Sequence, residues 1–144
     1  MPYTVTIYIA APGTPLLDKH GKATGEVSAA GHMWYSTHDG SKEQSFGFAP
    51  EGHSRTLGKG ALVDDDVQKY KDPAYARTME ITKTQFDSLQ DFGRNASQRG
   101  FDADFNGINN ACIDFTWTAL SRSGIVGNKN FEGAVRPLNN IIFI

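Results

Sequence analysis

The sequence has little of several features that would narrow its function at once. It contains a single cysteine, which excludes an internal disulfide, and a lone thiol is unremarkable in a reducing compartment. No apolar run is long enough to cross a bilayer, so we expect no membrane insertion. The formal net charge is -2, whereas a nucleic-acid-binding domain usually has a basic patch. We therefore expect no nucleic-acid partner.

The start of the chain also lacks the pattern of a secretory signal. Residues 1–5 read Met-Pro-Tyr-Thr-Val, without the basic and apolar regions of a signal peptide. We expect synthesis in the cytoplasm and, if the protein acts elsewhere, transport by a route other than general secretion. The 144 residues fit one domain, residues 1–144. A domain of this size buries roughly 68–70% of its unfolded surface, which is enough for a core.

Hydrophobic periodicity predicts an α+β fold. The expected strands cover residues 3–10, 31–37, 44–49, 75–81 and 141–144, and an Asp-Gly turn joins the second strand to the third. One expected helix runs from Thr82 or Thr84 to about Arg99, and another covers residues 111–121. Residues 16–27, 51–73 and 101–110 read as loops.

The lone cysteine lies where a nucleophile would be useful. Cys112 follows Asn109 and Asn110, and asparagine is a favoured N-cap, so the sulfur is expected in the first turn of a helix. There the unpaired backbone N–H groups and the helix dipole favour a thiolate and can receive an oxyanion. The alternative is a structural cysteine, because free cysteine is among the most buried residue types. Position alone leaves both interpretations open.

A thiolate nucleophile needs a base, which is usually histidine. His32 opens a strand of aromatic and apolar residues, and a rigid strand can aim an imidazole at a fixed partner. The other three histidines, His20, His38 and His53, fall in turns and loops that solvent would reach. The alternative for His32 is a histidine at the edge of the core that bonds to backbone.

A third group should orient the imidazole. If the hairpin is centred on its turn, His32 lies across from about Ala49, and Ser45 is the polar residue on the same face. We therefore choose Ser45. Gln44 would serve if the register slipped by one residue, and Glu51 would serve if the group lies just past the strand. An ordinary strand serine is the alternative for Ser45.

Three short motifs resemble the circularly permuted branch of the papain-like superfamily, which includes NlpC-like cell-wall peptidases. They are residues 31–35 (GHMWY), residues 45–50 (SFGFAP) and residues 110–115 (NACIDF). In that branch the histidine strand precedes the cysteine helix, and an aromatic residue follows the cysteine by three positions. Phe115 has that spacing, although Ala111 stands where the family usually has the asparagine. The resemblance implies a papain-like fold with an antiparallel sheet packed against the nucleophile helix.

The first two motifs, together with residues 131–139 (FEGAVRPLN), are similar more narrowly to toxin domains associated with type VI secretion and Rhs proteins. This resemblance implies a cysteine amidase or endopeptidase that cuts peptide bonds of peptidoglycan and needs no metal or organic cofactor. The implied partners are a peptidoglycan stem peptide, a carrier from the secretion apparatus and a cognate immunity protein. The implied site of action is the periplasm of a target bacterium.

Two other functions fit the same residues. The Cys–His pair also serves lipid acyl transfer and thioester cleavage in related families, although such proteins usually have an apolar anchor that this sequence lacks. A non-enzymatic binding or immunity module would keep Cys112 and His32 as core residues.

Overall fold

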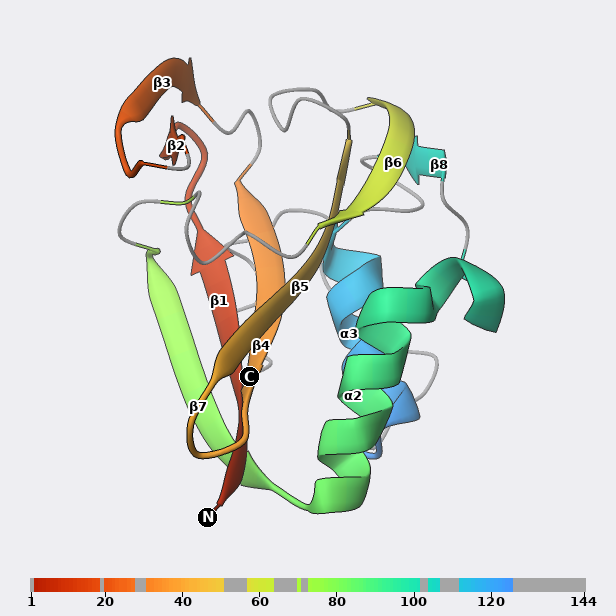
Figure 1. Cartoon of the computed structure of the whole chain (residues 1–144). Coiled ribbons are helices and arrows are strands. Elements are labelled where there is room, and N and C mark those ends of the chain that lie inside the picture. The colour runs from red at the N-terminus through yellow and green to blue at the C-terminus, as the bar shows by residue number, and fades with distance from the viewer. Residues whose placement is uncertain are drawn as a thin grey trace.

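In the part of the chain that the structure describes, six strands form one antiparallel sheet, with two α-helices packed on one side (Figure 1). The strand order is β7-β1-β4-β5-β6-β8. The strands are β1 (Tyr3–Ala10), β4 (His32–His38), β5 (Glu43–Pro50), β6 (Leu57–Val63), β7 (Tyr75–Ile81) and β8 (Asp104–Asn106). A second sheet pairs β2 (Pro15–Leu17) with β3 (Ala23–Val27). The helices are α2 (Lys83–Asn95), the short 3-10 helix η1 (Ala96–Arg99) and α3 (Cys112–Arg122).

This computed structural model describes residues 2–18, 20–27, 31–50, 57–63, 70, 73–101, 104–106 and 112–125. Within these ranges, no helix is long and apolar enough to cross a membrane.

The main core lies between the sheet and the helices. In β1, Val5, Ile7 and Ile9 are buried while the residues between them are partly exposed, which is the alternation expected of a strand with one face on a core. The helices contribute large apolar side chains, including Phe115 and Trp117 of α3. Burying this shared apolar face drives the sheet and helices together.

Strand β4 is buried on both faces. Met33 and Tyr35 point into the main core. Trp34, between them, joins a second cluster on the opposite face, in which the buried members Leu16 and Tyr70 come from outside the large sheet. All of β4 except its last residue is buried, so the strand on which His32 begins is enclosed by other elements.

Helix α2 begins at a capping box. The Thr82 hydroxyl accepts a hydrogen bond from the Gln85 backbone N–H, and the Gln85 side chain accepts one from the Thr82 N–H. Two of the N–H groups that a helix start leaves unpaired are thereby satisfied. Of the two expected caps, the structure selects Thr82.

The expectation of an α+β domain whose antiparallel sheet packs against the cysteine helix is confirmed. Three loop predictions were wrong in part. Residues 16–27 contain most of the β2–β3 hairpin, and residues 51–73 contain β6. Every residue of β3 is exposed, so no burial alternation marks it in the sequence. Residues 101–110 likewise contain β8. The strand expected at residues 141–144 lies outside the described residues.

We expect Gly93→Ala to destabilise the fold by about 1–2 kcal/mol, because a methyl group there would collide with the Phe46 ring and approach the Tyr35 hydroxyl oxygen to 2.8 Å. In an open helix interior the same change stabilises by about 0.8–1.0 kcal/mol, so the sign of the effect is diagnostic. Urea denaturation measures it, with the exposed α2 position Thr84→Ala as control. A stabilised Gly93→Ala protein would show that the packing of α2 on β5 is looser than described.

Candidate functional site

The sheet opens at the start of β4. Strand β4 pairs with β5 from His38↔Glu43 to Tyr35↔Phe46, and the pairing ends there among the described residues. Beyond Phe46, β5 continues beside β6 instead. The N–H and C=O of one strand residue point toward the same neighbouring strand. The Met33 groups therefore face the gap that β5 leaves.

Helix α3 fills this gap with two side chains. The Met33 N–H donates a hydrogen bond to Cys112 Sγ at 3.4 Å, and the Thr116 hydroxyl donates one to the Met33 carbonyl oxygen at 3.4 Å. Cys112 and Thr116 are four positions apart, so they lie on the same face of α3, one turn from each other. Met33 thus satisfies both of its backbone polar groups with side chains of the helix.

These contacts bring Cys112 to the residue next to His32. The Met33 nitrogen is two bonds from the His32 Cα, so Cys112 Sγ lies within about 6 Å of that Cα. The two contacting residues are 79 positions apart in the sequence. The fold therefore places the start of the cysteine helix against the start of the histidine strand.

The His32 imidazole belongs to an aromatic stack. Its ring lies 4.7 Å from the Tyr70 ring and 5.4 Å from the Trp34 ring, with interplanar angles of 15° and 22°. His32 is only 3% exposed and Cys112 only 5%. The two side chains have different surroundings, because the sulfur packs in the main core and the imidazole packs against Trp34 and Tyr70 on the other face of β4.

The stack continues from Trp34 to Tyr8, whose rings are 5.1 Å apart. The Tyr8 hydroxyl donates to Glu43 at 2.9 Å, and the Ser36 hydroxyl donates to the same carboxylate oxygen at 2.6 Å. Partial burial and the neighbouring Glu43 carboxylate both raise the pKa of Tyr8. Tyr8 thus stays protonated at neutral pH, and its hydrogen bond to Glu43 connects the stack to the β4–β5 hairpin.

The structure places Ser45 away from His32. The expected hairpin register is confirmed, and in it Ser45 pairs with Ser36, on the same face as His32. Ser36 is four residues from His32 along β4, which is a span of about 13 Å. That span is too long for a direct hydrogen bond between Ser45 and the imidazole, so we do not keep Ser45 as the orienting group.

Several expectations concern residues outside the described part of the chain. These are the capping role of Asn109 and Asn110, the exposure of His53 and the orienting role of Glu51. Gln44, the other candidate for that role, is described: its side-chain oxygen accepts a hydrogen bond from Arg94 at 3.3 Å.

The sequence analysis missed Thr116 and Tyr70. Thr116 was detectable in principle, because it lies one helical turn after Cys112 and so shares its face. Tyr70 carried no such signal, since it lies in a segment that reads as loop; in the described part of the chain, a β-bridge to Leu16 holds it beside the stack.

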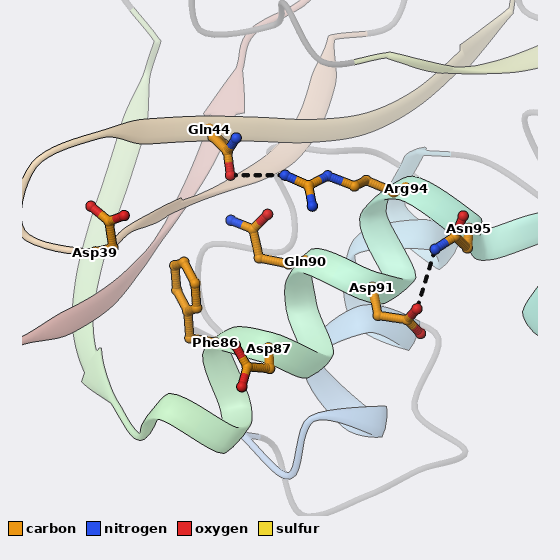
Figure 2. Close-up of a pocket in the computed structure, with 8 residues that line it drawn as sticks. All are labelled: Asp39, Gln44, Phe86, Asp87, Gln90, Asp91, Arg94 and Asn95. Atoms are coloured by element: carbon orange, nitrogen blue, oxygen red, sulfur yellow. Dashed lines mark hydrogen bonds between the residues drawn. The ribbon is translucent and has the colours of Figure 1, made fainter.

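The described surface also has an open hollow of about 470 Å³ between α2 and the β4–β5 turn (Figure 2). It is lined by Asp39, Gln44, Phe86, Asp87, Gln90, Asp91, Arg94 and Asn95. The backbone N–H groups of Ser41 and Lys42 lower the pKa of Asp39 to about 2. Hydrogen bonds from Arg99 and Asn95 lower the pKa of Asp91 to about 2. Both carboxylates are thus already engaged, and neither Cys112 nor His32 lines the hollow.

Among the described residues, no group of three or more histidine, cysteine, aspartate or glutamate side chains is placed to hold a metal ion. Comparison of the chain with protein-family models, with curated proteins and with solved structures finds no match. The assignment of the site therefore depends on its geometry and on the short motifs of the sequence.

We expect Gly31→Ala to destabilise the protein by about 2–4 kcal/mol. Gly31 leads into His32 with φ of +85°, and an added Cβ would lie 2.5 Å from the Ala10 carbonyl oxygen. Gly21→Ala is the matched control, because Gly21 has φ of +80° with open space around it, so that change isolates the backbone strain of about 1–2 kcal/mol. An equal loss of unfolding free energy for the two variants, measured by urea denaturation, would show that the start of β4 does not pack closely against β1.

Proposed function

We propose that this chain is a papain-like cysteine hydrolase of the permuted, NlpC-like kind, with Cys112 as nucleophile and His32 as base. One observation carries the proposal: Cys112 Sγ accepts the Met33 N–H at 3.4 Å, which puts the sulfur beside the residue that follows His32. The order of the two elements, histidine strand before cysteine helix, is also that of the permuted branch.

The environment of the sulfur suits a nucleophile. Cys112 is the first residue of α3, where helix N–H groups are unpaired and the dipole favours negative charge. The Met33 N–H adds a donor aimed at the sulfur itself.

The proposed reaction is hydrolysis of an amide in two steps. His32 takes the proton from the Cys112 thiol, and the thiolate attacks the amide carbonyl while N–H groups at the start of α3 hold the oxyanion. The C–N bond breaks as His32 returns the proton to the leaving amine, which leaves a thioester on Cys112. Water, deprotonated by His32, then attacks the thioester, and the carboxylic acid and the free thiol are released.

The stack gives His32 a defined ring plane. The rings of Tyr70 and Trp34 lie nearly parallel to the imidazole, which limits its rotation. A base must be held in a fixed orientation to transfer a proton efficiently, and here packing supplies that constraint.

The proposed substrate is a peptide bond of peptidoglycan, in a stem peptide or cross-link, and the proposed setting is antibacterial delivery into a periplasm. Both follow from the resemblance of the His32 and Ser45 motifs to type VI secretion and Rhs toxin domains. The reaction uses protein side chains and water, so the proposal involves no cofactor. A cognate immunity protein and a secretion carrier are the partners that this setting implies.

A non-enzymatic role is the competing candidate. The burial of Cys112 in the main core favours it, and so does the packing of the His32 imidazole on the other face of β4. Thiol reactivity separates the two. For an active site we expect iodoacetamide to alkylate the folded protein at pH 7, because a nucleophilic sulfur that substrate must reach is also open to a small alkylating reagent. The measurement is mass spectrometry of the native protein over time, with protein in urea as the fully reactive reference. Alkylation that occurs only in urea would identify a structural cysteine and would contradict the proposal.

Substitution of the pair tests the chemistry. We expect Cys112→Ala to abolish release of peptidoglycan fragments, and His32→Phe to lower its rate by about 10²–10⁴-fold, since loss of a general base typically costs that much. Phenylalanine keeps a ring in the stack and so limits unfolding, which circular dichroism checks. Fragments are identified by mass spectrometry.

Ser45→Ala is the matched control for these variants. Ser45 is buried on the same face of the sheet as His32, but it pairs with Ser36, which is four residues from His32. We expect it to keep a rate within about threefold of wild type. A folded Cys112→Ala or His32→Phe protein with the wild-type rate would remove that residue from the mechanism.

A further inference from the structure

The open edge of β4 is held at two points by one face of α3. Both contacts are made to a single residue of the strand, Met33. Cys112 contacts its N–H and Thr116, one helical turn later, contacts its C=O. A single contact would let the helix slide or rotate about the strand, whereas two contacts to one residue fix both motions. Thr116 is fully buried, so water cannot replace its hydroxyl at the Met33 carbonyl.

We propose that Thr116 is a positioning residue for the nucleophile: its hydroxyl anchors α3 to the Met33 carbonyl and so keeps Cys112 Sγ on the Met33 N–H, beside His32. This inference rests on the proposed function of Cys112. In this role Thr116 acts indirectly, through the Met33 peptide.

The length of the contact between Thr116 and Met33 sets the expected effect of removing the hydroxyl. The contact from Thr116 is 3.4 Å, which is long for an O–H···O hydrogen bond. Loss of this hydrogen bond should therefore change the alkylation rate of Cys112 severalfold. Loss of a general base, in contrast, lowers a catalytic rate by a factor of about 100 or more.

The experiment compares Thr116→Val, which keeps the shape and loses the hydroxyl, with Thr116→Ser, which keeps the hydroxyl and loses the methyl group. Thr118→Val is the control, because Thr118 lies on the same helix and is only partly buried. For each folded protein, the rate of Cys112 alkylation by iodoacetamide is measured from pH 5 to 9, and protection of the Met33 amide is measured by hydrogen exchange.

For Thr116→Val we expect a threefold to tenfold slower alkylation at pH 7 and faster exchange of the Met33 amide. Thr116→Ser should restore both readouts to within about twofold of wild type, and Thr118→Val should match wild type. Faster exchange of the Met33 amide with an unchanged alkylation profile would show a merely structural role and overturn the inference. Equal changes in the Val and Ser variants would assign the effect to the methyl group and overturn it as well.

The outcomes also separate this inference from the proposed function. If folded wild-type protein is not alkylated at any pH, the function assigned to Cys112 has failed and the positioning role fails with it. If wild type is alkylated and Thr116→Val behaves like it, the positioning role alone has failed.

Discussion

The arrangement of the candidate site depends on one interruption of the sheet. Strand β5 leaves β4 after Phe46 to pair with β6, and among the described residues Met33, which pairs with Ile9 of β1, has no partner strand on its β5 side. A buried peptide group without hydrogen bonds is costly, so something must satisfy it. Here α3 does so with a sulfur and a hydroxyl. The divergence of two strands thereby determines where the helix docks and brings Cys112 to the start of the histidine strand.

Much of the fold could be predicted from local patterns. The alternation in β1 and the Asp-Gly turn of the hairpin mark these elements directly, and Thr82 and Gln85 form the capping box at the start of α2. The predicted hairpin register was also right, because turn chemistry fixes which residues face each other. The short strands β3 and β6 escaped prediction, since one is exposed throughout and the other is rich in glycine.

The site was harder to predict because it depends on contacts between distant segments. Cys112 and His32 were identified from residue type and position, but the sequence does not state where β5 leaves β4. Ser45 was chosen because it shares a face with His32, but in the confirmed register it pairs with Ser36, which is four residues from His32 along β4. The end of the β4–β5 pairing at Phe46 creates the gap at Met33, and because this event is non-local, the contact of Thr116 with Met33 was not foreseen.

The burial of β4 on both faces determines which parts of the molecule unfold first. A strand enclosed by a helical layer on one side and an aromatic layer on the other cannot exchange its amide protons by fraying, and must wait for large-scale opening. The exposed strand β3 will open long before it. The backbone that carries His32 therefore belongs to the most persistent unit of the fold, so mild heat or denaturant should open the periphery of the domain while the contact between Met33 and Cys112 stays intact.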